Sequence, residues 1–361
     1  MQTYTRETFF NDMTTLPKPN RARERATQFR WRSLCKPIDS FGLLETTHIR
    51  LSGWSPDDEL RLQPRAVFVF AADNGIVEEG VTQTGQGVTA QVMRNMAQGR
   101  ATINTLAAEA HCVVVPVNVG VAELDTHVSG IVHVPVMPEG THNFAKEDAM
   151  DEDSMMLAIR VGMELAAKSA SEGMRLLIAG EMGIGNTSTA ATVIAALSGR
   201  QPSEIAGRGA GLSDEAFQRK LLVLDDALSD RRPNRYNALD VLRAVGGLDI
   251  AAMVGFYAGA ARAGVPVILD GLITLSAAMT LVRLVPETRA IFFASHHPAE
   301  PAGDIALREI GLLPMIDAGF RHGEGTGAMF LLPLLDMADR LYRDTLTFDE
   351  GDVAPYDVYG D

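Results

Sequence analysis

Residues 175–190 read RLLIAGEMGIGNTSTA, and this stretch decides the fold. Its first five residues, RLLIA, have the length and apolar character of a buried strand, and an alanine-rich segment follows the glycines. A short apolar strand, a glycine-rich turn and then a helix form the repeating unit of proteins in which strands and helices alternate. The stretch therefore predicts an α/β protein.

Five further runs have the same character as this strand. They are short, rich in β-branched residues and mostly separated by segments with helical periodicity. They cover residues 66–71 (AVFVFA), 112–117 (CVVVPV), 131–136 (IVHVPV), 265–269 (VPVIL) and 291–294 (IFFA). Continuous apolar strands between helices are typical of parallel sheets that are covered on both faces. We therefore predict a mostly parallel six-stranded sheet flanked by helices.

Two segments show the helical periodicity best. The first follows Thr89, a candidate N-cap, and the second surrounds Met156. The apolar residues that recur on one face are Val92, Met96, Ile103 and Leu106 in the first segment, and Met156, Ile159 and Met163 in the second. Both segments are expected to form helices.

Composition excludes several classes of protein. With 361 residues, 46% hydrophobic and 22% charged, the chain is long enough for one large core and a smaller lobe. A net charge of -14, without clustered Lys and Arg, argues against nucleic-acid binding. The most apolar region, residues 248–285, is interrupted by four charged residues and fails as a membrane span. The first 32 residues are charged and lack the apolar stretch of a signal peptide, so we expect a cytoplasmic protein.

The domain organisation follows from where the strands lie. No repeat or low-complexity linker divides the chain, and the strands fall within one continuous region. We predict a large α/β domain over residues 58–333 and a smaller helical lobe formed by both ends, residues 1–57 and 334–361. Residues 348–361 are acidic with two tyrosines, and they are expected to form either a solvated tail or an arm that faces a partner.

Cysteine and histidine usage gives no sign of a metal site. Cys35 and Cys112 are far apart and have no Cys or His neighbour at metal-ligand spacing, so neither a disulfide framework nor a zinc site is indicated. His296 and His297 are adjacent, but no Asp or His accompanies them at helical spacing. We predict no metal.

Polar residues and glycines cluster after the strands. In open α/β sheets, ligands bind beyond the carboxyl ends of the strands. Five of the six predicted strands are followed by such residues: 73–75 (DNG), 118–120 (NVG), 180–187 (GEMGIGNT), 270–271 (DG) and 295–297 (SHH). We therefore place the site at this edge of the sheet.

The turn over residues 183–189, GIGNTST, is the best candidate for an anion site. Its glycines allow backbone N–H groups to approach a phosphate at the start of a helix. The pattern is weak by itself, because it lacks the lysine of a P-loop and the third glycine of a dinucleotide fingerprint. Asn186, Thr187 and Ser188 also fit a purely structural role as helix caps.

Glu324 lies between glycines in the segment RHGEGTG, residues 321–327. A glutamate with glycine neighbours has little side-chain cover, so it can face a cleft and accept a proton there. The alternative is a turn glutamate that binds backbone N–H groups. Glu181 has two comparable interpretations: a second carboxylate of the site, or a residue favoured by the dipole at a helix start.

A third glycine-rich run, GRGAG, covers residues 207–211 and is followed by Lys220. Arg208 and Lys220 are candidates to neutralise a phosphate, although lone basic residues on helices are often merely solvated.

Taken together, these motifs resemble one known family. The blocks that carry the resemblance, from about residue 34 to 346, are KPIDSFGLLE (36–45), AADNGIVEEGVTQTGQGVT (71–89), GTHNFAKEDAM (140–150), GEMGIGNTSTA (180–190), GRGAGLSDE (207–215), VGGLDIAAMVG (245–255), LDG (269–271) and RHGEGTGAM (321–329). Eight blocks in the same order are far more specific than any one of them. The chain resembles the nicotinate-nucleotide:dimethylbenzimidazole phosphoribosyltransferases.

The resemblance implies both a fold and a set of roles. It implies a homodimer whose large domain is a Rossmann-like sheet and whose small domain gathers helices from both chain ends. By the same resemblance, Glu324 is the catalytic base, Glu181 a second essential carboxylate and Lys220 a lysine near the nucleotide. Gly183, Gly185, Asn186 and Thr187 are expected at the phosphate and ribose, and Thr84, Gln86, Met182 and His322 in the base pocket. Arg208, Asp270, Gly271 and Ser295 complete the nucleotide-binding residues that we predict.

The implied reaction fits these residue types. Such enzymes transfer the ribose phosphate of nicotinate mononucleotide to an aromatic base, a step that makes the lower ligand of a cobamide. The pyridine nitrogen of that nucleotide is cationic, so nicotinate leaves readily and no metal or other cofactor is expected. Positioning and one proton acceptor then cover most of the catalytic work.

Several residues differ from the pattern of the family and keep other functions open. Asn74, Gly87, Asn118, Asp249, Pro298 and Asp304 depart from its usual residues. His322 replaces an apolar residue beside Glu324, which disfavours a dimethylated ring and favours a purine or a phenolic base. A relative that uses such a base or a heteromeric partner is one alternative, and a non-catalytic nucleotide-binding subunit is another. The presence of both Glu181 and Glu324 argues against the latter.

Overall fold

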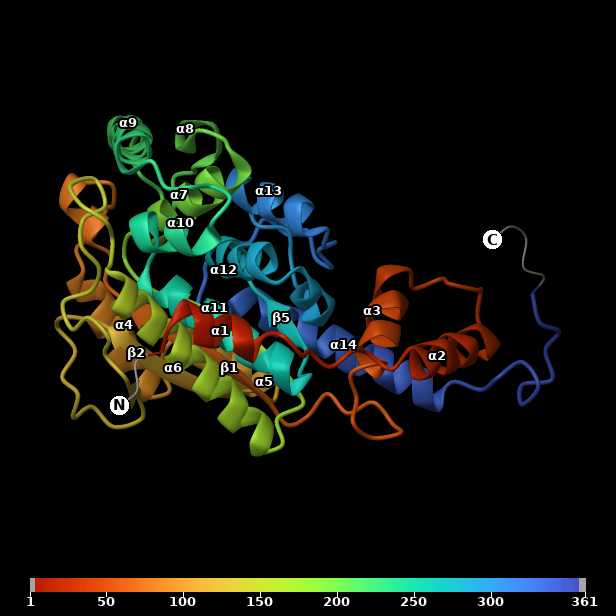
Figure 1. Cartoon of the computed structure of the whole chain (residues 1–361). Coiled ribbons are helices and arrows are strands. Elements are labelled where there is room, and N and C mark those ends of the chain that lie inside the picture. Colours follow the sequence, from red (N-terminus) through yellow and green to blue (C-terminus); the bar gives the residue numbers. More distant parts are fainter. Residues whose placement is uncertain (1–3, 357–361) are drawn as a thin grey trace.

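A six-stranded sheet lies at the centre of the computed structural model, which describes residues 4–356 (Figure 1). All pairs of neighbouring strands in this sheet are parallel, and the strand order is β3-β2-β1-β4-β5-β6. The strands are β1 (Arg65–Ala72), β2 (Val113–Gly120), β3 (Val132–His133), β4 (Leu176–Met182), β5 (Val267–Leu269) and β6 (Phe292–Ala294). The six predicted strands and the parallel sheet are confirmed. The order is that of a doubly wound Rossmann sheet.

Burial explains why these segments form strands. All eight residues of β1 are buried, as are the first six residues of β4. The two strands are neighbours at the middle of the sheet, where Ala71 pairs with Met182, so their carboxyl ends lie level. The residues that follow β1 and β4 therefore start from the same edge of the sheet.

Helices connect and cover the strands. In the described residues they are α1 (Arg6–Asp12), α2 (Arg21–Ser33), α3 (Leu43–Ser52), α4 (Gly87–Ala97), α5 (Thr102–Glu109), α6 (Glu152–Ser171), α7 (Asn186–Ser198), α8 (Pro202–Ile205), α9 (Asp214–Arg231), α10 (Ala238–Val245), α11 (Leu248–Ala263), α12 (Leu272–Leu284), α13 (Pro301–Ile310) and α14 (Thr326–Asp344). From the central strands, β2 lies on one side and β5 on the other. Right-handed crossovers in opposite directions therefore place α4 and α5 on one face of the sheet and α11 and α12 on the other.

The helical segment predicted after Thr89 differs from the structure. Two helices, α4 and α5, stand in place of one, because the chain turns at Gly99, whose φ is +73°. Thr89 is no N-cap: it lies inside α4, fully buried, and its hydroxyl accepts a hydrogen bond from the N–H of Ile184 at 3.2 Å. The role of Thr89 is therefore a tertiary contact with the turn after β4 and not the capping of a helix. The second predicted segment is confirmed as part of α6, where Met156, Ile159 and Met163 are buried.

Helices α6 and α11 cross in direct contact of their backbones. A Cβ atom added at Gly162 of α6 would overlap the carbonyl group of Ala252, and one added at Gly255 of α11 would overlap the carbonyl group of Ile159. Glycine is therefore the only residue that leaves both helices where they are. Because α11 also packs on β1, β2 and β4, this contact fixes α6 as a second layer over the sheet.

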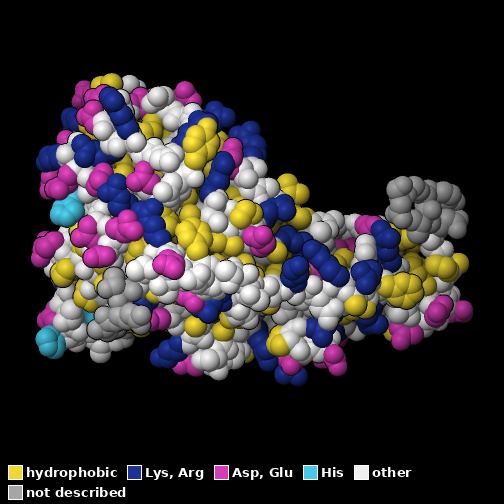
Figure 2. Space-filling model, viewed as in Figure 1, with side chains coloured by type: hydrophobic (Ala, Val, Ile, Leu, Met, Phe, Trp, Pro, Cys, Tyr) yellow, Lys and Arg dark blue, Asp and Glu magenta, His cyan; other side chains and the backbone are white. Residues whose placement is uncertain are grey.

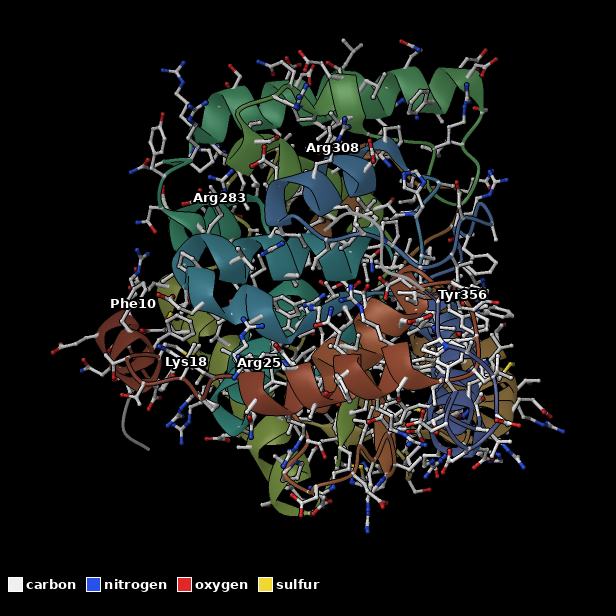
Figure 3. All side chains as sticks on the ribbon, turned by 90° about the vertical axis from the view of Figure 1, so that its right-hand side faces the viewer. Phe10, Lys18, Arg25, Arg283, Arg308 and Tyr356 are labelled. Carbon is white, nitrogen blue, oxygen red and sulfur yellow. The ribbon has the colours of Figure 1, made fainter. Side chains whose placement is uncertain are left out.

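An arm of helices extends from the sheet-bearing part of the molecule (Figure 1). It consists of α2, α3 and the last turns of α14, which share a separate apolar cluster around Trp31, Leu34 and Ala338. The first helix lies elsewhere: α1, which carries Phe10, is well separated from α2 in Figure 3, and its Arg6 pairs with Glu152 of α6.

The boundaries predicted for two domains stay a prediction. Helix α14 crosses the predicted boundary at residue 333 without ending, since it runs from Thr326 to Asp344. At its middle, Asp336 receives two hydrogen bonds from the buried guanidinium of Arg65, at 2.7 and 2.6 Å, which ties α14 to the start of β1. Residues 357–361 of the predicted acidic tail lie outside the described residues. Within residues 4–356, no helix has the length and apolar character needed to cross a membrane.

Replacing Asp151 by alanine is expected to lower the free energy of unfolding by about 1 kcal/mol at pH 7. Asp151 is the N-cap of α6, and its carboxylate accepts a hydrogen bond from the N–H of Ser154 at 2.7 Å. This bond lowers the pKa of Asp151 below its ordinary value of 3.8. The contribution is therefore complete above that value and is lost as the pH falls through the lowered pKa.

Urea unfolding of the wild type and the Asp151→Ala variant, at pH 7 and again well below pH 3.8, measures this difference. Asp153→Ala is the matched control, because it removes an equal charge from the first turn of α6 and leaves the cap in place. A loss of unfolding free energy in Asp151→Ala that is the same at both pH values, or that equals the loss in Asp153→Ala, would contradict a stabilising role of Asp151 as N-cap.

Candidate active site

A cavity of about 290 Å³ opens beyond the carboxyl ends of β4, β5 and β6. Its walls come from segments far apart in the sequence. They are residues 81–84, 181–187, 208–212, 271–274, 298–300 and 320–324, together with Val92 and His296. The cavity thus lies at the edge of the sheet where the strand order predicts a ligand site.

The structure brings most of the predicted site residues into this cavity. Those that line it are Thr84, Glu181, Met182, Gly183, Gly185, Asn186, Thr187, Arg208, Gly271, His322 and Glu324. Those that do not are Gln86, Lys220, Asp270 and Ser295. For all fifteen residues, contact with a nucleotide or base stays a prediction.

Glu324 occupies a left-handed backbone conformation that only a few non-glycine residues adopt. Its φ is +61°, between +87° at Gly323 and +86° at Gly325. Such a conformation costs about 1 to 2 kcal/mol for a residue with a Cβ atom, so other contacts must hold it. The turn ends where α14 begins, and both the N–H and the hydroxyl of Thr326 bind the carbonyl of Gly323, at 3.0 and 2.7 Å.

Asp270 is the main anchor of this turn. Its carboxylate accepts hydrogen bonds from the N–H groups of Gly325 at 3.1 Å, Gly327 at 2.7 Å and Ala328 at 3.2 Å. Burial raises its pKa, and these three backbone bonds act against that shift. Asp270 was predicted to bind the nucleotide. In the structure its oxygens hold the first turn of α14, and through it the backbone of Glu324.

The two carboxylates of the site come from adjoining segments, the end of β4 and the turn before α14, and both line the cavity. One oxygen of Glu324, Oε2, accepts a hydrogen bond from the N–H of Ile103 at 3.3 Å, at the start of α5. The position of a Cβ atom at Gly323 would be 2.5 Å from Oε1 of Glu181, so the end of β4 touches the turn directly. The lack of a side chain at Gly323 is what allows Glu181 and Glu324 to share the cavity.

Glu181 belongs to a buried network with Asn186 and Asp249. The side-chain amide of Asn186 donates hydrogen bonds to Oε2 of Glu181 and, at 3.2 Å, to Oδ2 of Asp249. Burial, followed by repulsion from Asp249, raises the pKa of Glu181 to about 8. Burial also raises the pKa of Asp249 to about 6. Both effects favour the protonated form of Glu181, which can donate a hydrogen bond into the cavity.

The glycine turn after β4 points the start of α7 at the cavity. Gly185 has a φ of +96° and is the N-cap of α7, and residues 183–187 all line the cavity. Thr89 holds this turn through the N–H of Ile184, as described above. The N-terminus of a helix carries a partial positive charge and suits a phosphate.

Lys220 lies behind the start of α7. It is fully buried on α9, and its Nζ is 3.3 Å from the hydroxyl of Thr187. Burial lowers the pKa of Lys220 to about 8, and the charge of Glu300 opposes the shift. Glu300 in turn accepts a hydrogen bond from the N–H of Gly209 at 2.9 Å, which ties the loop of residues 207–211 to the segment after β6.

Three other predicted residues are engaged within the protein. Arg208 lines the cavity, but its guanidinium binds Asp214 at 2.6 Å and the carbonyl of Leu212 at 2.9 Å. Gln86 donates to the carbonyl of Asn74 at 3.2 Å. The hydroxyl of Ser295, fully buried, lies 2.9 Å from Nδ1 of His296.

The sequence predictions did not include several residues of the site. Thr89, Asp249 and Glu300 have the contacts just described, and His296, Phe320 and Arg321 also line the cavity. His296 and Arg321 are neighbours in sequence of the predicted site residues Ser295 and His322, and this proximity could have indicated them. For Asp249 no local signal existed, because its partner Asn186 is 63 residues away. In residues 4–356 no three His, Cys, Asp or Glu side chains come together in a group that could hold a metal ion.

Comparison with known proteins identifies the family of this chain. A phosphoribosyltransferase family model matches residues 16–353. Three similar proteins, all named nicotinate-nucleotide–dimethylbenzimidazole phosphoribosyltransferase, come from Acetivibrio thermocellus, Desulforamulus reducens and Pseudomonas putida. Their identities to this chain are 37%, 40% and 38%. The matches cover 91%, 89% and 94% of this chain and 93%, 92% and 96% of the relatives.

Solved structures give the same result. A crystal structure of nicotinate-nucleotide-dimethylbenzimidazole phosphoribosyltransferase from Thermus thermophilus superposes with a TM-score of 0.86 at 35% identity, over 93% of this chain and 99% of that one. A crystal structure of CobT from the same organism also has a TM-score of 0.86, at 36% identity over 92% and 99% of the two chains. Fold and sequence agree: the chain belongs to the nicotinate-nucleotide–dimethylbenzimidazole phosphoribosyltransferase family.

Proposed function

We propose that this phosphoribosyltransferase transfers the ribose 5-phosphate of nicotinate mononucleotide to dimethylbenzimidazole. The products are nicotinate and the α-riboside 5'-phosphate that becomes the lower ligand of a cobamide. One observation carries the proposal: Glu324 and the turn beginning at Gly183 line the same cavity. A proton acceptor and a phosphate site are the two elements that the reaction needs side by side.

The nucleotide is placed by the carboxyl edge of β4 and the start of α7. Its phosphate binds the backbone of residues 183–187, where the helix dipole favours negative charge. Lys220, through Thr187, adds positive charge behind this turn. Protonated Glu181 donates a hydrogen bond toward the ribose, which an ionised carboxylate cannot do.

The base enters from the side of Glu324. A ring nitrogen of the base attacks C1' of the ribose, the bond from C1' to the pyridine nitrogen breaks, and nicotinate leaves with the bonding electrons. The second ring nitrogen then gives its proton to Glu324. Attack on the face opposite the leaving group inverts C1' and gives an α-riboside.

The alternatives to this function are not favoured. The three relatives described above are all named for dimethylbenzimidazole. A purine or phenolic base therefore lacks support beyond the side chain of His322. A non-catalytic nucleotide-binding subunit is at odds with two carboxylates, Glu181 and Glu324, lining one cavity.

Release of nicotinate from nicotinate mononucleotide, followed by mass spectrometry, tests the function. We expect rapid release with dimethylbenzimidazole and little without a base, because the nucleophile must be present for C1' to react. In competition with a purine and a phenol, dimethylbenzimidazole should be used preferentially. A clear preference for either competitor would overturn the proposed base, and no release with any base would overturn the proposed reaction.

We also propose a homodimer that works in the cytoplasm. Figure 2 shows hydrophobic side chains gathered on the arm, where Phe29 of α2 is 77% exposed and Leu346 is 56% exposed. Exposed apolar surface of this kind is typical of interfaces between subunits. A cytoplasmic location fits a charged nucleotide substrate, which does not cross membranes unaided. Sedimentation of the purified protein measures its mass and tests the dimer.

A further inference from the structure

His322 is the polar side chain next to Glu324 that is also open to solvent. Its Nε2 lies 3.8 Å from Oε1 of Glu324, the oxygen that does not bind Ile103. The imidazole side chain is 51% exposed and the carboxylate side chain 11%. One ring nitrogen thus faces the carboxylate on the inside of the cavity, while the ring as a whole reaches water.

The other titratable groups around this carboxylate are closed off from solvent. Glu181 after β4 is 6% exposed, Asp270 after β5 is 2% exposed and His296 after β6 is 3% exposed. Asp270 is held by three backbone N–H groups and His296 by Ser295. The other charged side chains that line the cavity are Arg208, Glu300 and Arg321. The two arginines have no proton to exchange at ordinary pH, and Glu300 accepts a hydrogen bond from the N–H of Gly209.

The proton taken by Glu324 must leave before the next turnover. Asp270 anchors the turn after Glu324 through three backbone N–H groups, and this holds the side chain of Glu324 at the cavity. With base and nucleotide filling the cavity, water has no free access to the carboxyl group. A group that touches both Glu324 and solvent solves this problem.

We propose that His322 relays the proton from Glu324 to solvent, and this proposal rests on the function proposed above. Neutral His322 accepts the proton of the Glu324 carboxyl group at Nε2, which restores the carboxylate. The imidazolium then releases a proton to water from Nδ1, and a tautomeric exchange returns the ring to its starting form. No other reactant is needed, and each turnover sends one proton from the base to solvent.

The electrostatics of the pair give the relay a pH dependence. The interaction with Glu324, whose Oε1 lies 3.8 Å from Nε2, raises the pKa of His322 above its ordinary value of 6.5; burial opposes this shift and the charge of Asp270 adds to it. Below this raised pKa the imidazole is already protonated and cannot accept a proton. Turnover should therefore increase with pH through a value above 6.5 and level off at alkaline pH.

The experiment compares wild type with His322→Ala and His322→Gln, measuring nicotinate release as kcat and KM from pH 6 to 9. Removal of the relay is expected to lower kcat roughly tenfold, less than the loss of a direct general base, while KM for the nucleotide changes little. The increase of kcat through the pKa of His322 should vanish in both variants. Added imidazole should restore kcat of His322→Ala, which has room for it, and leave His322→Gln unchanged.

His127→Leu is the matched control, because this histidine is exposed, pairs with Asp125 and lies outside the cavity. Its kcat and pH profile should equal those of wild type. Variants of His322 that keep the wild-type pH profile, or a lowered kcat that imidazole does not restore, would overturn the relay. Failure of the proposed function is distinguishable, because then the wild-type protein itself releases no nicotinate.

Discussion

Replacing Glu324 by glutamine is expected to lower kcat for nicotinate release about a thousandfold, within the 10²- to 10⁴-fold range of general acid–base catalysis. Glutamine has the same shape, so it can keep the hydrogen bond that Ile103 donates to the side chain and leave the anchoring bonds of Asp270 intact. It has no basic oxygen to take the proton of the attacking base. Binding of the nucleotide should be nearly unchanged, since the proposed phosphate site is formed by the backbone of residues 183–187 and not by Glu324.

Steady-state kinetics and urea unfolding together test this expectation. Glu204→Gln is the matched control, because Glu204 is a half-exposed residue of α8 outside the cavity, with no role in the reaction. A Glu324→Gln protein that is folded and keeps more than a tenth of wild-type kcat would mean that another group accepts the proton.

Gly180→Ala is expected to lower kcat about a hundredfold and the free energy of unfolding by about 2 kcal/mol. Gly180 lies within β4, and an added Cβ atom would overlap the carbonyl group of Glu324 and the nitrogen of Gly325. Both obstacles are backbone atoms of the anchored turn, so the turn itself must move away from the sheet. A displacement of about 1 Å at a reacting group is enough for a loss of this size.

A control variant separates the effect of displacing the turn from the general effect of adding a methyl group. Gly85→Ala is the control for stability, because its Cβ atom would meet no atom within 4 Å and its φ is not positive. That variant should unfold at the same or a slightly higher urea concentration than wild type. Gly180→Ala with kcat within twofold of wild type would show that the turn does not depend on close contact with β4.

The strands and the glycine turn were predictable because their signal is local. A run such as AVFVFA is buried on both faces of the sheet, and the sequence GIGNT leads directly from strand to helix, so neighbouring residues contain the whole pattern. The edge of the sheet at which the cavity lies was also predictable, because ligands bind beyond the carboxyl ends of the strands in open α/β sheets. Glu324 stood out because the glycines on both sides of it leave its side chain without cover.

The contacts that tune the site were not predictable from such patterns. Thr89 and Ile184 are 95 residues apart, and the same threonine fits the pattern of an N-cap equally well. Asp270 follows a strand as binding residues do, but its partners are N–H groups of a helix 55 to 58 residues later. Every residue except proline has the same backbone N–H group, so no sequence pattern marks the N–H groups that a carboxylate will bind. Such a carboxylate therefore cannot be distinguished in the sequence from one that binds a ligand.

The close crossing of α6 and α11 has a consequence for the acidity of Glu181. Asp249 is the second residue of α11, and Gly255 follows about 9 Å further along the same helix axis. Any side chain at Gly162 or Gly255 would wedge the two helices apart and tilt α11, which would change the distance from Asp249 to Asn186 and Glu181. Two residues without side chains, outside the cavity, thus help to set the proton affinity of a group within it.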